Sequence, residues 1–314
     1  MGRQRKRKGD PVHGWLAVDK PVDVSSTRVV GILKRVFNAQ KAGHGGTLDP
    51  LADGILPVAF GEATKTAQWA MDCDKEYVFT VEWGSSTASQ DKEGDVIATS
   101  DVRPTREQIE AILPDFIGDI QQVPPKYSAI KIDGERAYDL ARDGESFEIP
   151  SREVTVYEAE LVSIPDKDHA TFRVVSGKGF YIRALARDLS VALGAEGHVS
   201  QLRRTRVGAL DASNSVSLAA LEAMAEDRDA LFAHLLPLET VLDDVPQVEI
   251  DAGDAAALKQ GREIVLLPHT VEQFRSAAEA FGSDRLALAA TDRVAVALGE
   301  VRAGRFQPKK VFQL

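Results

Sequence analysis

The sequence is poor in cysteine and in long apolar runs. Cys73 is the single cysteine among 314 residues, which excludes a disulfide framework and any metal site built from several cysteines. No segment approaches the roughly 18 consecutive apolar residues of a membrane span, so we expect no contact with membranes. The basic start MGRQRKRKGDP is not followed by the apolar segment of a secretory signal. These absences lead us to expect a cytoplasmic protein.

The common signatures of nucleotide, hydrolase and zinc chemistry are also missing. The chain has no G-x-S-x-G nucleophile elbow and no G-x-x-x-x-G-K-[ST] phosphate loop. GHGGTL (43–48) lacks the third glycine of a dinucleotide-binding fingerprint, and SGKGF (176–180) is a weak match to a phosphate loop. The six histidines include no pair at metal-ligand spacing. Hydride transfer, NTP hydrolysis and zinc chemistry therefore find no support.

The charges are unevenly distributed along the chain. A net charge of −10 would at first argue against a nucleic-acid partner. Residues 1–48, however, carry ten Lys/Arg against three Asp/Glu, and residues 178–206 carry six against two. Residues 211–300 carry six against seventeen, so the acidity is concentrated late in the chain. A polyanionic partner stays compatible with this pattern; the alternative is ordinary solvated faces and a disordered basic tail over residues 1–11.

Helical and strand patterns are mixed along the chain without a regular βαβ repeat. This favours an α+β fold with a mixed, mostly antiparallel central sheet flanked by helices. GWLAVDK (14–20) has the composition of a strand. SSTRVVGILKRVF (25–37) has the apolar spacing of a helix, with Ser25 or Ser26 as its N-cap. A capping box at Thr105 predicts the start of another helix. We expect one large domain over residues 12–245 and a small one over residues 246–314.

The stretch GHGGTLDPLADGIL (43–56) places one carboxylate, Asp49, between a run of glycines and a proline. Apolar neighbours such as Leu48 and Leu51 indicate packed rather than wet surroundings. A carboxylate in such a place is either a turn cap or a reagent. Because Asp before Pro commonly forms an Asx-turn that satisfies its own backbone, the local pattern alone favours the turn.

Other candidate residues have equally ordinary explanations when each is taken alone. Tyr77 fits a core aromatic, while Tyr181 and Arg183 fit a half-buried ring and a surface cation. His44 fits a hydrogen-bonded structural residue better than a ligand. QLRRTRVG (201–208) fits a solvated basic turn. None of these residues establishes a function by itself.

Six sequence blocks follow one another in this order: KPVDVSS (20–26), GHGGTLDPLADGIL (43–56), KEY (75–77), QVPPKYSAIKIDGERAYDLAR (122–142), GKGFYIRALARDL (177–189) and HVSQLRRTRVG (198–208). The series resembles the bacterial TruB-type tRNA pseudouridine synthases, the enzymes that modify uridine 55 in the T loop. The resemblance runs from about residue 14 to residue 208, with a weaker echo in the C-terminal domain. Six ordered blocks are not expected by chance, and the block that contains Asp49 is itself highly specific.

The resemblance implies a pseudouridine synthase fold over residues 12–245 and a PUA-like, RNA-contacting domain over residues 246–314. It implies a cofactor-free and metal-free isomerase that detaches uracil from its ribose, turns it and rejoins it through C5. The expected partner is tRNA, bound at its T stem-loop, and we expect the enzyme to be a monomer.

Two rival functions share this fold. One is a non-catalytic protein that binds tRNA or helps it fold; Asp49 favours the enzyme, since a pure binder has no use for an anion facing phosphate. The other is the archaeal and eukaryotic relative that modifies rRNA within a guide-RNA complex. The compact chain and the lack of long lysine-rich extensions argue against this second rival.

The resemblance also assigns catalytic roles. Asp49 matches the nucleophile, which would attack the ribose C1′ or the base C6; in a third proposal it removes a C2′ proton to give a glycal. Arg183 matches the arginine that pairs with the aspartate and would keep it ionised and fixed in a dry pocket. Tyr77 matches the tyrosine that stacks on the extruded base and could also exchange a proton with the substrate.

Further residues match positions around the substrate. Tyr181 and Leu202 match residues that line the uracil pocket, and His44 matches a histidine that fills the space vacated in the RNA loop. On charge alone, we expect phosphate contacts from four cations: Lys20, Arg203, Arg204 and Arg206.

The loop after Trp83 departs from the family pattern. It reads SSTASQD (85–91), where relatives often have T-D-T-x-D; Asp91 is retained and the middle acid is not. Before Lys178 the chain has Ser-Gly where many relatives have Cys-Ser. We expect neither position to carry chemistry.

Overall fold

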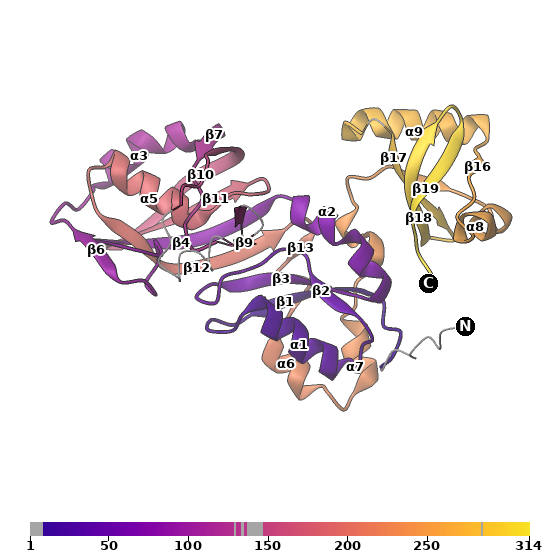
Figure 1. Ribbon diagram of the computed structural model, residues 1–314, viewed down its shortest axis with the longest axis horizontal. Coiled ribbons are helices and arrows are strands. Elements are labelled where there is room, and N and C mark those ends of the chain that lie inside the picture. Colours follow the sequence, from indigo (N-terminus) through magenta and orange to yellow (C-terminus); the bar gives the residue numbers. More distant parts are fainter. Residues whose placement is uncertain (1–8, 129, 133–134, 137–146, 284) are drawn as a thin grey trace.

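The computed structural model describes residues 9–128, 130–132, 135–136, 147–283 and 285–314. These residues form a large domain built on one mixed sheet and a separate C-terminal sheet domain (Figure 1). The predicted α+β class is confirmed. Part of the predicted helix in block 122–142 lies outside the described residues.

The last residues of the predicted basic tail contact the large domain. The backbone N–H of Asp10 donates to the carbonyl of Asn38 at 2.6 Å, and the Asp10 carboxylate pairs with Arg228 at 2.9 Å. Residues 9–11 therefore pack against the domain, and the prediction of disorder is wrong for them. Residues 1–8 lie outside the described part of the chain.

The central sheet has ten strands. Two neighbouring pairs, β1–β14 and β3–β12, are parallel and the others are antiparallel, which confirms the mixed, mostly antiparallel sheet. Two short strands pair off the main path: β2 (Ala42–His44) with β3 and β13 (Leu210–Asp211) with β12. In spatial order the main strands are β14 (Ser215–Ser217), β1 (Gly14–Lys20), β3 (Asp53–Phe60), β12 (Gly197–Val207), β4 (Lys75–Trp83), β11 (His169–Ser176), β10 (Arg152–Asp166) and β7 (Gly118–Gln122).

Strand β12 contains most of the segment whose composition fits a solvated basic turn. It lies between β3 and β4 at the middle of the sheet, and its register pairs Arg204 with Tyr77 and Leu202 with Phe79. Leu202 and Arg204 are both buried. An inward-pointing arginine in a central strand breaks the usual alternation of apolar and polar residues, so the pattern did not predict this strand.

The best-predicted helices are those with local start signals. Helix α1 (Ser26–Val36) begins after Ser25, whose hydroxyl accepts from the backbone N–H of Arg28. Helix α3 (Arg106–Ile112) has the predicted capping box at Thr105. Helix α5 (Ile182–Ala192) and helix α3 lie at one end of the large domain in Figure 1, while α1 lies at the other end of the sheet near α6 and α7. Cap residues stabilise a helix start by about 1 kcal/mol.

The remaining short elements connect these parts. They are η1 (Gly61–Thr66), α2 (Ala67–Asp72), β5 (Ser85–Thr87), β6 (Val96–Thr99), η2 (Leu113–Phe116), β8 (Lys131–Ile132), β9 (Glu135–Arg136), α6 (Leu218–Ala223), α7 (Arg228–Ala233) and η3 (Leu238–Val241). Within the described ranges, no helix has the length and apolar content that a bilayer crossing requires.

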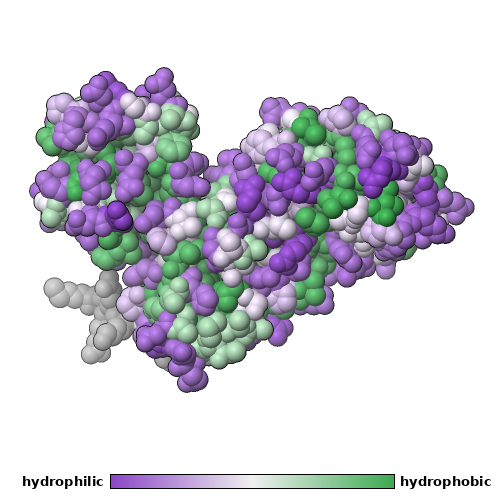
Figure 2. All heavy atoms as spheres, turned by 180° about the vertical axis from the view of Figure 1, so that it is seen from behind, coloured by the Kyte–Doolittle hydropathy of each residue, from purple (hydrophilic) through white to green (hydrophobic). Residues whose placement is uncertain are grey.

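The C-terminal domain has its own sheet and its own core. A core around Phe274 and Phe306 fills its interior. Figure 2 shows this domain from behind as a separate lobe, with a notch between it and the main body. Its elements are β15 (Gln247–Glu249), α8 (Ala252–Lys259), β16 (Ile264–Val265), α9 (Pro268–Phe281), β17 (Leu286–Thr291), β18 (Val294–Arg302) and β19 (Arg305–Val311).

The end of the chain fastens the C-terminal domain to the large one. Phe312 is fully buried in an apolar cluster that also contains Trp15. On either side of it, Lys65 Nζ donates to the Val311 carbonyl at 2.7 Å, and the Gln313 backbone N–H donates to Glu62 at 2.7 Å. The last strand therefore returns to the large domain and fixes the placement of the small one.

Candidate active site

A pocket of about 340 Å³ opens where β4 and β12 meet the loop of residues 46–49 and the start of α5. Its lining includes six of the predicted site residues: Asp49, Tyr77, Tyr181, Arg183, Leu202 and Arg204. A second hollow of about 510 Å³ shares Asp49, Arg183 and Ser128 with this pocket. Asp49 therefore lines both pockets and lies between them.

Asp49 forms an ion pair with Arg183. Arg183 Nη2 lies 3.0 Å from Asp49 Oδ2, and Nη1 lies 3.5 Å from the carboxylate of Asp91. The same two nitrogens donate to the backbone carbonyls of Ser89, at 2.9 Å, and Tyr127, at 2.8 Å. The guanidinium is thus fixed by two carboxylates and two carbonyls, and it holds the Asp49 carboxylate in one orientation.

The surroundings of Asp49 are only partly as expected. Leu48 and Leu51 are buried, as the sequence predicted. The Asp49 side chain, however, is 35% exposed while that of Arg183 is 6% exposed, so the pair is not enclosed in a dry core. Within the described part of the chain, no backbone N–H donates to the Asp49 carboxylate, which removes the Asx-turn explanation. The carboxylate faces the pocket, and the buried Arg183 guanidinium contacts it from the protein interior.

The loop that carries Asp49 is held by α1 and the segment before it. The Ser26 hydroxyl donates to the Leu48 carbonyl and accepts from the Leu48 N–H, both at 2.9 Å. Lys20 Nζ donates to the carbonyl of Pro50 at 3.3 Å and to that of Val24 at 2.7 Å. The backbone on each side of Asp49 is therefore fixed by a side chain from elsewhere in the fold.

Lys20 does not have the setting expected of a phosphate contact. It is fully buried, and its ammonium also donates to the Pro21 carbonyl at 2.9 Å. Burial lowers its pKa to about 8, while the charges of Asp53 and Asp49 act in the opposite direction. Three carbonyls inside the fold satisfy this cation in the free protein, and its phosphate contact stays a prediction.

Arg204 is also buried and supports the same loop from the other side. Its Nε donates to the Ile55 carbonyl at 2.7 Å, Nη1 to Thr47 at 3.3 Å and Nη2 to Gly46 at 3.2 Å. A Cβ at Gly54 would lie 2.2 Å from the Arg204 carbonyl oxygen, and Gly54 has φ of +100°. Only glycine fits there. The Arg204 guanidinium thus donates to three carbonyls of the fold, and its phosphate contact stays a prediction.

Tyr77 and Leu202 form the sheet side of the pocket. Both are buried, on the neighbouring strands β4 and β12. Tyr181 precedes α5, where its N–H donates to Gln122 Oε1 at 2.9 Å and its carbonyl accepts from Gln122 Nε2 at 3.2 Å. The guanidinium of Arg152 lies over the Tyr181 ring, 5.0 Å from its centroid. Gln122 and Arg152 thus fix the backbone and the ring of Tyr181.

The other predicted residues lie away from the pocket lining. His44 is on β2; burial, followed by the charge of Arg204, lowers its pKa, which favours the neutral ring at pH 7. Arg203 pairs with Asp19 at 3.0 Å and Asp53 at 2.9 Å. Arg206 donates to the Gly208 carbonyl at 3.5 Å. The predicted roles of His44, Arg203 and Arg206 toward RNA, like that of Lys20, therefore stay predictions that need tests of their own. Of the four cations expected to contact phosphate, Arg203 and Arg206 alone are not buried.

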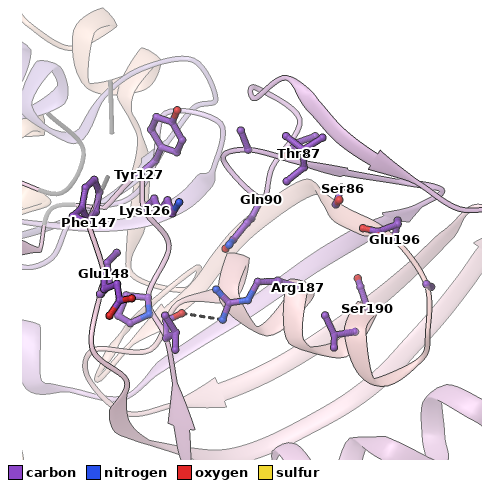
Figure 3. A pocket seen from close by; sticks show the side chains of 18 residues that line it. Ser86, Thr87, Gln90, Lys126, Tyr127, Phe147, Glu148, Arg187, Ser190 and Glu196 are labelled. Carbon is purple, nitrogen blue, oxygen red and sulfur yellow. Dashed lines mark hydrogen bonds between the residues drawn. The ribbon is translucent and has the colours of Figure 1, made fainter. Parts of the chain in front are cut away.

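A larger hollow of about 890 Å³ lies beside the site and shares Ala88 and Tyr127 with the second one. Figure 3 shows Arg187 reaching into it from α5 and bonding to the carbonyl of Val123, at 2.9 Å. Neither Asp49 nor Arg183 lines it. In the described ranges, no three His, Cys, Asp or Glu side chains are grouped so that they could hold a metal ion.

Sequence reasoning missed Asp91, Ser26, Gln122 and Arg152. We expected no chemistry from the loop that ends in Asp91, yet this carboxylate is buried against Arg183. It is held by the Ser89 hydroxyl at 2.5 Å and the Glu93 N–H at 3.0 Å. The retained acid in the SSTASQD loop was the available signal.

Comparison with solved structures defines the class of fold. A chain of a Cbf5–Nop10–Gar1 complex is 26% identical and superposes with a TM-score of 0.71, covering 96% of this chain and 85% of that chain. A chain of an archaeal box H/ACA sRNP Nop10–Cbf5 complex gives a TM-score of 0.69 at 24% identity, covering 99% and 93%. The architecture is the pseudouridine synthase fold.

Sequence relatives place the chain within that class. Residues 34–182 match the N-terminal domain of the TruB family of pseudouridylate synthases, and residues 183–243 match the tRNA pseudouridylate synthase B C-terminal domain. A tRNA pseudouridine synthase B of Caulobacter vibrioides is 54% identical over 99% of both chains. One of Bradyrhizobium diazoefficiens is 48% identical over 100% of this chain and 89% of its own. The chain belongs to the TruB family of pseudouridylate synthases, isomerases that convert uridine to pseudouridine.

Proposed function

We propose that this protein converts uridine 55 in the T loop of tRNA to pseudouridine, with Asp49 as the nucleophile. The observation that carries the proposal is the Asp49–Arg183 ion pair of 3.0 Å, which faces a pocket that is also lined by Tyr77. The relatives that are 54% and 48% identical are named as tRNA enzymes, which supports the substrate class.

The proposed reaction begins with extrusion of the uridine from its stack, since neither C1′ nor C6 is accessible inside a folded loop. Tyr77 would stack on the extruded base, with Leu202 on the neighbouring strand completing that wall of the pocket. Asp49 then attacks C1′ or C6, or removes a C2′ proton; the uracil turns and rejoins through C5. Arg183 holds the carboxylate in its orientation throughout.

The rival functions are weaker on specific grounds. A binding protein would gain nothing from fixing one exposed carboxylate with a buried arginine, because an anion repels phosphate. The chains from the two Cbf5 complexes share the fold at 26% and 24% identity, well below the 54% of the Caulobacter tRNA pseudouridine synthase B. The rival function within a guide-RNA complex is therefore less well supported. We also propose that the protein binds the T stem-loop of tRNA, acts as a monomer and is located in the cytoplasm.

The experiment is tritium release from a tRNA transcript that carries tritium at C5 of its uridines. C5 loses its hydrogen only when it becomes the attachment point of the ribose. We expect release of one tritium for each tRNA, without added metal or cofactor, and none from a transcript with cytidine at position 55. Equal release from the cytidine transcript would reject the position, and no release from either would reject the proposed function.

A further inference from the structure

The pocket that contains Asp49 is lined by more positive than negative side chains. Besides Arg183, its lining includes Lys75, Arg152 and Arg204, while Asp49 is the only carboxylate among the lining residues that the structure describes. Cations in a partly buried pocket need partners, because an unpaired buried charge is costly. The hydrogen bonds and ion pairs of each cation show which of them have partners within the protein.

Three of the four cations have partners inside the fold. Lys75 Nζ donates to the carbonyl of Met71 at 2.6 Å and also to that of Cys73. Arg204 donates to three carbonyls of the loop around Asp49. Arg183 pairs with two carboxylates and two carbonyls. These three hold the protein together and have little left to offer a ligand.

Arg152 is different. Among the described residues no carboxylate lies within ion-pair distance of it, and its one hydrogen bond runs from Nη2 to the Gly179 carbonyl. Its Nε is buried without a hydrogen-bond partner. The guanidinium nevertheless has a fixed place, because it lies over the ring of Tyr181 with 5.0 Å to the centroid. A planar donor group held in this way loses little freedom when it binds an anion.

The backbone beside Arg152 leaves room for a close approach. Gly177 and Gly179, from the SGKGF segment that only weakly matched a phosphate loop, line the same pocket. Gly179 has φ of +81°, and a Cβ there would lie 3.4 Å from Cζ of Arg152. A Cβ there would be in ordinary van der Waals contact with the guanidinium, so the positive φ, rather than lack of space, favours glycine at this position.

We propose that Arg152 is a substrate-binding residue that takes a backbone phosphate of the extruded nucleotide. This inference rests on the proposed function, because an extruded uridine brings its flanking phosphates to the mouth of the pocket. The phosphate supplies the anion that Arg152 lacks in the free protein, and Tyr181 supports the guanidinium from behind. A purely structural role for Arg152, that of holding Gly179, is the alternative.

The test is a cycle that combines a protein change with a substrate change. T-arm RNAs carry one neutral methylphosphonate at a time, at each phosphate flanking the target uridine, and KM is measured for wild type and Arg152→Met. We expect one methylphosphonate to raise the wild-type KM by about 10-fold, the loss expected for one charged hydrogen-bond pair. Arg152→Met should raise KM on natural RNA by a similar factor, and the two changes together should cost no more than either alone.

Salt dependence and a control variant separate the phosphate role from a structural one. The slope of log affinity against log salt should fall by about one for Arg152→Met. It should stay at the wild-type value for Arg106→Met, which removes an exposed arginine paired with Glu110 on α3. If Arg152→Met does not fold, Arg152→Lys retains the charge and allows the same methylphosphonate scan.

The outcomes separate this inference from the proposed function. If wild type forms no pseudouridine on natural RNA, the proposed function fails. If wild type is active but every methylphosphonate affects the Arg152 variant as strongly as it affects wild type, the phosphate contact is wrong and Arg152 is structural.

Discussion

Arg183 and Asp49 form an ion pair in which the guanidinium is buried and the carboxylate is open to the pocket. Nη2 and Oδ2 are 3.0 Å apart, and the side chains are 6% and 35% exposed. This asymmetry suits a reagent: the protein fixes the positive partner within its core and leaves the negative one within reach of a substrate. A stabilising surface ion pair would expose both partners.

Arg183→Lys should reduce kcat strongly and leave RNA binding nearly unchanged. A lysine ammonium cannot contact the Asp49 and Asp91 carboxylates and two carbonyls at the same time. The Asp49 carboxylate would therefore lose its fixed orientation. We expect a fall in kcat of about 100-fold or more, with KM within about threefold. Arg187→Lys, one turn further along α5, is the matched control. A kcat within about threefold of wild type for Arg183→Lys would contradict the positioning role.

Arg204→Met and Arg203→Met should differ in their effect on stability. Arg204 is buried and serves three carbonyls, so its loss leaves those groups unsatisfied and should lower the free energy of unfolding by about 3 kcal/mol. Arg203 forms partly exposed ion pairs, and its loss should cost less than about 1 kcal/mol. Urea unfolding of both variants measures the difference. Equal losses would show that Arg204 does not support the loop in the way described.

Lys20 should make stability depend on pH in the alkaline range. Burial lowers its pKa to about 8 from 10.5, so the unfolded chain keeps this proton to a higher pH than the folded one. Below pH 8 both the folded and the unfolded chain carry this proton, so the cost of burying the charge lowers the free energy of unfolding in full. As the pH rises from 8 toward 10.5, the folded chain loses the proton first and this cost decreases. The free energy of unfolding of wild type, minus that of Lys20→Met, should therefore increase with pH over this window. A flat or falling difference in urea unfolding would contradict the burial of the ammonium.

Phe312→Ala should loosen the C-terminal domain. Truncation of a buried Phe costs about 3–5 kcal/mol, here lost from the cluster that includes Trp15. We expect a higher KM for full-length tRNA and an unchanged KM for an isolated T-arm hairpin, since the pocket itself is untouched. Leu314→Ala, at an exposed position, is the control. A loss that is equal for both RNAs would place the effect in the catalytic domain.

The sequence predicted those parts of the fold that local signals determine. The N-cap at Ser25 and the capping box at Thr105 are short-range bonds, and both lie where they were expected. The identities of Asp49 and Arg183 came from ordered motifs, and the structure brings these residues together.

The burial of charged groups could not be predicted in the same way. Charge alone predicts exposure, yet Lys20 and Arg204 are satisfied by carbonyls that fold back from the loop around Asp49. The contact of Arg183 with Asp91 joins segments far apart in the chain, so no local pattern contains it. Such bonds depend on the register of β12 and the path of a loop, which only the assembled fold determines.

Asp49→Ala tests the central claim most directly. Wild type and variant are incubated with an unmodified tRNA transcript, pseudouridine is mapped by a base-specific chemical adduct and primer extension, and tRNA affinity is measured in parallel. The account predicts a stop at position 55 with wild type and none with the variant, whose rate falls by at least about 1,000-fold while its affinity for tRNA stays close to that of wild type. A stop of similar intensity with Asp49→Ala would contradict the assignment of Asp49 as the nucleophile.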